Sequence, residues 1–191
     1  MCPSPDAPEI LDRLQRLEGL RLARSATEAW TIRGVRPIPP IPSPLDRVFA
    51  SAFVTLNLES KLRGCVGSLD PSRPLGETLI DCAIAASCKD TRFPPVTAQE
   101  LSRLRFEISV LTSFEPLHDP AAIRIGVDGL MLEKSGRRGL LLPQVASQQG
   151  WNFESFLDHA CLKAGLKTGE WKSDARIQVF RAQVFAGGDP D

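Results

Sequence analysis

Hydrophobic and polar positions along the chain predict a mixture of helices and strands. Apolar side chains recur at helical spacing over residues 10–30, with arginines between them, so an amphipathic helix that covers a sheet is expected there. Asp6 is the expected N-cap of this helix, with Glu9 at the capping-box position. The same spacing recurs over residues 75–86, and residues 97–100 carry the capping-box pattern of a short helix.

Two other segments show the two-residue period of a strand. Residues 49–58 alternate between two faces, and one of these faces carries Phe53, Thr55 and Asn57. A turn at Glu59 and Ser60 is expected to return residues 61–69 as the partner of this strand. Residues 104–110 alternate most regularly, and solvent is the expected partner of their polar face, which carries Glu107 and Ser109.

The C-terminal half is predicted to form a small meander followed by helices. Asp128-Gly129 is a two-residue hairpin signal, and residues 134–139 form a looser turn. Short helices are expected over 143–150 and 152–165, and a last strand over 175–184. Because strict βαβ alternation is missing, the fold class is α+β, with an antiparallel or mixed β-sheet packed with helices.

Composition narrows the class of protein. The 191 residues are 42% hydrophobic and 24% charged, which is typical of a globular domain. Lys plus Arg equals Asp plus Glu, 23 against 23, so the chain lacks the overall basic charge of proteins that live on nucleic acid, although a local basic patch is still compatible with it. No apolar run is long enough to span a membrane, and the N-terminus does not resemble a signal peptide, so we expect a cytoplasmic protein without membrane association.

The distribution of cysteines and histidines does not suggest a metal site. The five cysteines form no C-x-x-C pair, and the two histidines, His118 and His159, lie in unrelated segments. Structural zinc sites draw paired ligands from tight local spacings, so no metal ligands are assigned. The thiols are expected to be reduced.

The most unusual stretch of the chain is Lys61-Leu62-Arg63-Gly64-Cys65-Val66-Gly67. Glycine permits positive φ and close approach of another chain or a ligand, so Gly64 and Gly67 predict a bulged or sharply turned strand that directs Cys65 to a specific place. The stretch is not a nucleotide-binding fingerprint, because it lacks the strand, glycine-rich turn and helix order that places phosphate on a helix N-terminus.

These residues resemble a known family. Leu62-Arg63-Gly64-Cys65-Val66-Gly67 is similar to the L-R-G-C-I-G (LRGCIG) signature of the AMMECR1 domain, with Val66 in place of isoleucine. Residues 53–55, 89–95, 107–111, 126–130, 142–146, 150–151 and 163–166 match further motifs of the family in the same order. The similarity covers residues 10–185, so residues 1–191 are expected to form a single AMMECR1-like domain, with residues 1–8 and 186–191 as mobile tails.

The similarity is greatest to the bacterial and archaeal branch called AmmeMemoRadiSam system protein A. It implies an α+β fold with a larger and a smaller subdomain, and a cleft between them that contains the signature. It also implies a Memo-like protein and a radical SAM protein as partners. It implies no particular reaction, substrate or cofactor. Many bacterial members have histidine where this chain has Asn57, so the most obvious base for Cys65 is missing here.

Two hypotheses follow for the site. In the first, Cys65 is the catalytic residue of a system component that modifies a small molecule or a protein, and Lys61 and Arg63 lower the pKa of its thiol. Arg63, Gly64, Gly67, Asp90 and Arg92 would then bind the ligand. In the second, the chain is a non-catalytic module that binds a protein or metabolite, and Cys65 is a small packed residue. The pair Asp90 and Arg92 has a corresponding structural explanation, in which it ties its own loop to the backbone.

Overall fold

The computed structural model describes residues 8–187, which divide into two compact units. The larger unit contains residues 9–110 and 183–187, and the smaller unit contains Pro8 and residues 111–182. Each unit combines helices with its own β-sheet, so the predicted α+β fold class is confirmed. The expected tail residues 1–7 and 188–191, and the expected cap Asp6, lie outside the described residues.

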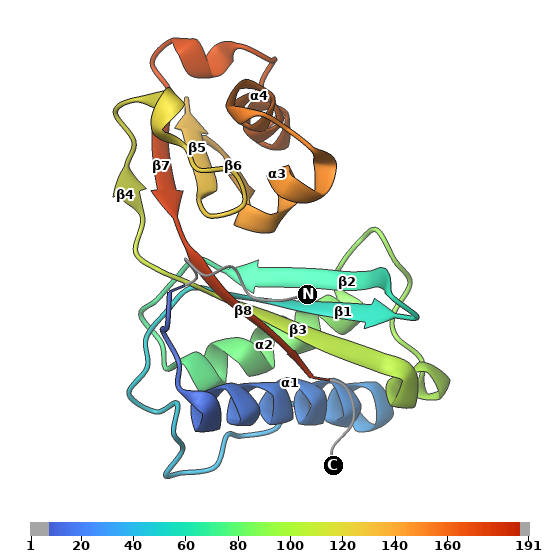
Figure 1. The fold of residues 1–191 in the computed structure, drawn as a ribbon. Helices are drawn as coiled ribbons and strands as arrows, with labels where there is room; N and C mark the ends of the chain where they lie inside the picture. Colours follow the sequence, from blue (N-terminus) through green and yellow to red (C-terminus); the bar gives the residue numbers. More distant parts are fainter. Residues whose placement is uncertain (1–7, 188–191) are drawn as a thin grey trace. The chain divides into compact units, whose positions relative to one another are not determined.

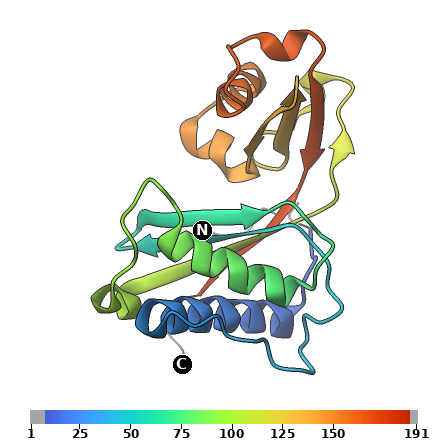
Figure 2. The same ribbon diagram turned by 180° about the vertical axis from the view of Figure 1, so that it is seen from behind.

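The larger unit is a sheet covered by two helices on one face (Figures 1 and 2). The strand order is β2-β1-β3-β8, and β1 pairs antiparallel with both of its neighbours. The strands are β1 (Ala52–Leu58), β2 (Lys61–Ser68), β3 (Leu104–Leu111) and β8 (Ala182–Gly187). The helices are α1 (Arg13–Arg33) and α2 (Leu75–Cys88), and the short 3-10 helix η1 (Ala98–Arg103) precedes β3.

The two-residue period of β1 and β3 produces this arrangement. Val54 and Leu56 in β1, and Phe106 and Ile108 in β3, are completely or almost completely buried, and they form one core with residues of both helices. Thr55 and Glu107 alternate with them and are paired across the strands on the opposite face of the sheet. The predicted division of both strands into two faces is therefore confirmed. The expectation that solvent is the partner of Ser109 is wrong, because Ser109 is buried.

The first helix begins later than its sequence pattern predicts. It starts at Arg13, where the carboxylate of Asp12 accepts a hydrogen bond from the backbone N–H of Gln15 at 2.8 Å. The residues before it are not helical, because the backbone N–H groups of Ile10 and Leu11 both donate to Oε1 of Gln183. These long-range bonds take the place of the first predicted helical turn.

The smaller unit has a second four-stranded sheet, with the order β4-β7-β5-β6 and antiparallel pairing throughout. Its strands are β4 (Glu115–Pro116), β5 (Gly129–Lys134), β6 (Arg137–Leu141) and β7 (Arg176–Phe180). Its helices are α3 (Pro143–Gln149) and α4 (Phe153–Lys163), with short 3-10 helices η2 (Pro120–Ala122) and η3 (Glu170–Lys172). Leu130 and Leu132 pack against Phe156 and Leu157 to form its separate core.

The hairpin predicted at Asp128-Gly129 is wrong. The carboxylate of Asp128 accepts hydrogen bonds from the backbone and guanidinium of Arg124, which hold residues 124–128 in a turn outside the sheet. The hairpin instead joins β5 to β6, and its two turn residues, Ser135 and Gly136, have φ values of 51° and 74°. Both values suit a two-residue hairpin turn.

The single last strand predicted over residues 175–184 is also wrong, because the chain changes sheets within it. β7 lies in the sheet of the smaller unit, and β8 lies beside β3 in the other sheet. At the break, Arg181 exchanges two hydrogen bonds with Thr112: its backbone N–H donates to the Thr112 hydroxyl, and its carbonyl accepts from the Thr112 N–H. β8 then continues to Gly187, so residues 186 and 187 belong to a strand and not to a tail.

None of the helices within residues 8–187 is both long enough and apolar enough to cross a membrane.

Candidate functional site

The signature stretch forms β2, the edge strand of the larger unit's sheet. A turn at Glu59 and Ser60 joins it to β1, as predicted, and Cys65 lies opposite Thr55. The register shifts where Leu56 pairs with Gly64 and Asn57 pairs with Leu62, so Arg63 is the additional residue of a β-bulge. The predicted bulge is thereby confirmed.

The two glycines of the signature permit close approach, and neither has positive φ. A Cβ atom at Gly64 would lie 2.1 Å from the carbonyl oxygen of Ala86, so the glycine lets helix α2 contact the backbone of β2. A Cβ atom at Gly67 would lie 2.2 Å from the ring of Phe53, the residue opposite it in β1. Protein atoms, and not a ligand, therefore occupy the space that both glycines leave.

Arg63 connects the bulge to the loop that follows α2. Its guanidinium binds the carboxylate of Glu100 at two points, 2.7 and 3.1 Å, and donates to the carbonyl oxygens of Pro94 and Pro95. Glu100 also accepts from the N–H of Thr97, which confirms the predicted capping box. The hydrogen bond from Arg63 is the main reason why the pKa of Glu100 is lowered to about 2. Arg63 is thus largely committed to protein acceptors.

Asp90 and Arg92, which lie in the loop after α2, contact the same strand at Cys65. The carboxylate of Asp90 accepts a hydrogen bond from the backbone N–H of Cys65 at 2.9 Å. It also binds Arg92 through three donors, of which the shortest contact, from Nη2, is 2.6 Å. Arg92 holds the pKa of Asp90 far below its ordinary range, although burial opposes the shift. The structure therefore brings together Cys65, Asp90 and Arg92, which the sequence suggested only as possible neighbours.

The thiol of Cys65 is half-buried, and the hydroxyl of Thr55 donates a hydrogen bond to its sulfur at 3.2 Å. Burial raises the pKa of this thiol above its ordinary value. Thr55 and Arg92 oppose that increase, whereas the carboxylates of Asp90 and Glu107 reinforce it. The hypothesis that Lys61 and Arg63 lower the pKa of the Cys65 thiol is therefore wrong: Arg63 is bound to Glu100, and the cation that acts on the sulfur is Arg92.

Glu107 belongs to the site, although the sequence pattern predicted that its side chain would face solvent. Thr55 pairs with Cys65 on one side and with Glu107 on the other, so the three side chains form one row across β2, β1 and β3. Burial raises the pKa of Glu107, and within residues 8–187 its carboxylate has no hydrogen-bond or ion-pair partner. Strand alternation placed Glu107 on the polar face, but only the register of three strands shows that it shares a row with Cys65.

In the described part of the chain, no three His, Cys, Asp or Glu side chains lie close enough together to hold a metal ion. Of the cysteines described, Cys82 and Cys161 are buried, and Cys65 and Cys88 are partly exposed; all four are free thiols. Cys82 packs in the core, as predicted, and burial raises its pKa to about 12. Among these four thiols, Cys65 is the one whose sulfur accepts a hydrogen bond from a side chain, the hydroxyl of Thr55.

Comparisons with known proteins agree with the signature. The family model described as AMMECR1 matches residues 20–185. A protein from Methanothermobacter thermautotrophicus is 46% identical over 154 residues, which cover 75% of this chain and 80% of the relative. A protein from Thermofilum pendens is 47% identical over 137 residues, which cover 68% of this chain and 64% of the relative. The crystal structure of an uncharacterised protein from Pyrococcus horikoshii has a TM-score of 0.88 and 38% identity, and the match covers 96% of each chain. The chain belongs to the AMMECR1 family.

Proposed function

We propose that the protein is a component of a system with Memo-like and radical SAM proteins, and that it acts on a small molecule or a protein side chain at the sheet face that carries Cys65. The observation that supports this proposal is the row of Cys65, Thr55 and Glu107, which sets a thiol, a hydroxyl and a carboxylate side by side on adjacent strands. Thiols and carboxylates with shifted pKa values are typical of sites that transfer protons.

The directions of the pKa shifts of Cys65 and Glu107 indicate which proton transfers the row of side chains supports. The pKa of the Cys65 thiol is raised, so at neutral pH the resting site holds a neutral thiol and not a preformed thiolate. The pKa of Glu107 is raised as well, which makes its carboxylate a stronger base than an ordinary glutamate. A hydroxyl can both accept and donate a proton. We therefore assign Glu107 as the group that takes up the Cys65 proton when a ligand reacts. In the resting site the Thr55 hydroxyl donates to the sulfur, so this transfer requires the hydroxyl to turn, accept from the thiol and donate to Glu107.

Arg92 supplies a way to recognise an anionic ligand. Its side chain is 52% exposed, and Nε and Nη2 are bound to Asp90. Nη1 has no hydrogen-bond partner among the described residues, so it can donate to a ligand carboxylate or phosphate beside Cys65. Asp90 orients this guanidinium, and Arg63 positions the loop that carries both residues, through the carbonyls of Pro94 and Pro95.

One observation favours a second function, a non-catalytic module that binds a protein or metabolite. Burial raises the pKa of the Cys65 thiol, which makes it less reactive, and Arg63 is paired with Glu100 within the protein. In that case Arg92 would still bind the ligand, but Cys65 would only pack and accept the hydrogen bond from Thr55.

The rate of Cys65 alkylation as a function of pH separates these functions. Iodoacetamide labelling is followed for the Cys65 peptide by mass spectrometry, which distinguishes it from the other cysteines. Alkylation follows the equilibrium fraction of thiolate and not the transfer of a proton to a base, so it measures only the electrostatic effect of each group. Glu107→Gln removes a negative charge that raises the thiol pKa, so labelling at a fixed neutral pH should become faster. Arg92→Gln removes the opposing positive charge, so labelling should become slower. Unchanged profiles in both variants would show that neither group acts on the sulfur, and would leave only the binding module.

Association with the two partners is tested in the native cell. The tagged chain should co-purify with the Memo-like and radical SAM proteins, and Cys65→Ala should preserve that association if the thiol is used for chemistry and not for docking. Absence of both partners from the purified material, under conditions that retain other complexes, would refute membership of such a system.

A further inference from the structure

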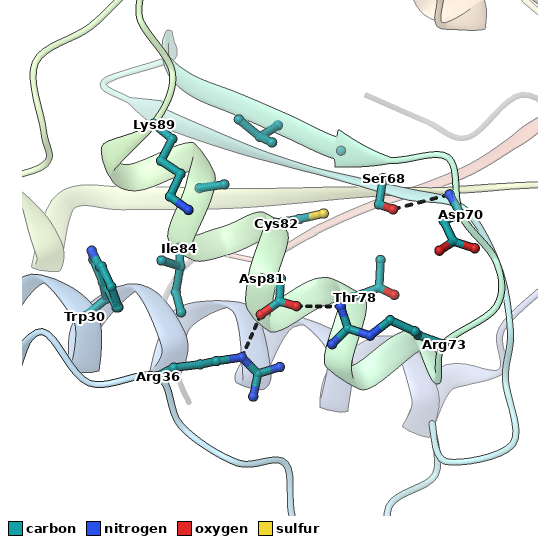
Figure 3. A pocket seen from close by; sticks show the side chains of 13 residues that line it. Trp30, Arg36, Ser68, Asp70, Arg73, Thr78, Asp81, Cys82, Ile84 and Lys89 are labelled. Atoms are coloured by element: carbon teal, nitrogen blue, oxygen red, sulfur yellow. Dashed lines mark hydrogen bonds and ion pairs between the residues drawn. The ribbon is translucent and has the colours of Figure 1, made fainter.

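The larger unit has a groove lined by residues of α1, α2 and β2, and neither Cys65 nor Glu107 is among its lining residues. Its volume is about 530 Å³, within the range of small-molecule sites. β2 supplies Val66 and Gly67, α2 supplies Ile84 and Ala85, and Trp30 of α1 adds an aromatic side chain. Figure 3 shows Trp30, Ile84 and Lys89 toward one end, and Asp70 and Arg73 toward the other.

Most charges in this groove neutralise one another. The carboxylate of Asp81 accepts from Nε of Arg36 at 2.6 Å and from Nη1 of Arg73 at 2.8 Å, as the dashed lines in Figure 3 indicate. Glu77 binds the same two guanidinium groups. Two cations and two anions thus form a closed network, so neither arginine carries an uncompensated charge into the groove.

Lys89 is different, because within residues 8–187 no carboxylate lies within ion-pair distance of its ammonium group. It is exposed and follows the last residue of α2. The indole N–H of Trp30, at the same end of the groove, also has no hydrogen-bond partner among the described residues. This end therefore offers a positive charge and a neutral donor beside apolar side chains, which is suited to one anionic group attached to an apolar body.

We propose that this groove binds a small organic monoanion, with its carboxylate or related acidic group at Lys89 and Trp30 and its aryl or alkyl body against Val66, Ile84 and Ala85. The site contains neither Cys65 nor Glu107, so it does not depend on the function proposed for them. A charged head that is recognised by one cation, next to a mainly apolar lining, is the ordinary composition of small-molecule sites.

The test uses two fluorescent probes that differ in one acidic group: 1-anilinonaphthalene-8-sulfonate and the uncharged N-phenyl-1-naphthylamine. The measured quantity is the ratio of their dissociation constants. Lys89→Met removes the charge and should shift this ratio against the sulfonate by about twofold to fivefold, the range for one charge pair in contact with water. Lys89→Arg should preserve the ratio. Lys61→Met removes one charge elsewhere on the same unit, from β2, and should also preserve it.

A second variant tests the place of the apolar body. Ala85→Leu adds volume to the groove at a helical position, where leucine is only slightly less favourable than alanine, and it should weaken binding of both probes without changing their ratio. The proposal is overturned if Ala85→Leu binds both probes as the wild type does. It is equally overturned if Lys89→Met leaves the ratio unchanged, or if Lys61→Met shifts it as far as Lys89→Met does.

Discussion

Replacing Gly64 with alanine should strongly destabilise the larger unit. The added Cβ would lie 2.1 Å from the carbonyl oxygen of Ala86, whereas ordinary contacts of this kind exceed 3.4 Å, so α2 and β2 would have to separate by more than 1 Å. The obstacle is a backbone atom in the last turn of α2, and it cannot rotate away as a side chain could. Overpacking typically costs about 1–3 kcal/mol, and we expect about 3 kcal/mol or more here.

The measurement is urea unfolding, followed by the fluorescence of Trp30. Trp151 and Trp171 lie in the smaller unit and are replaced by phenylalanine in the background protein, so that the signal reports the larger unit. A loss of about 3 kcal/mol is a large part of the stability of a typical domain, which is about 5–15 kcal/mol.

Gly19→Ala is the matched control, because it makes the same chemical change within the same unit. Its Cβ would lie 3.1 Å from Cδ1 of Leu79, a flexible side chain, and alanine favours the helical position by about 1 kcal/mol. We expect a change of less than about 1 kcal/mol in either direction. If Gly64→Ala were as mild as this control, the packing explanation of the first signature glycine would be refuted.

Three further predictions concern the same unit. Gly67→Ala should destabilise it less than Gly64→Ala, because the obstacle is the ring of Phe53, and the double variant with Phe53→Leu should recover part of the loss in the same unfolding assay. The pKa of Glu100 is lowered to about 2, so the stabilisation that its carboxylate provides is complete above its unfolded pKa of about 4.3 and is lost as the pH falls toward 2. Glu100→Gln should therefore reduce the loss of unfolding free energy over this pH range. An unchanged loss would contradict the ion pair between Arg63 and Glu100. The pKa of Glu107 is raised, so its ionised carboxylate lowers the stability of the folded protein. Glu107→Gln should therefore raise the melting temperature at neutral pH and leave it unchanged below about pH 4. Equal effects at both pH values in thermal unfolding would argue against burial of the carboxylate.

The row of Cys65, Thr55 and Glu107 shows where sequence reasoning reached its limit. Alternation along β1 and β3 predicted correctly which residues share a face. It could not predict which residues lie opposite one another, because register depends on the turn, the bulge and the packing of the opposite face. Asn57 stands where a histidine base is expected, and no local pattern connects Cys65 with the carboxylate of Glu107 on β3.

By itself, the sequence determined the family, the α+β class and most helices and strands, since these depend on local periodicity and on motifs that follow one another along the chain. Only the tertiary structure decided what the signature does. From the sequence, Gly64 and Gly67 were compatible with positive φ or with close approach of another chain or a ligand. Their partners Ala86 and Phe53 show that the requirement is close packing within the unit. The pKa of the Cys65 thiol is raised and not lowered as expected. Its burial and the nearby carboxylates cause this shift, and both depend on segments that are distant in sequence.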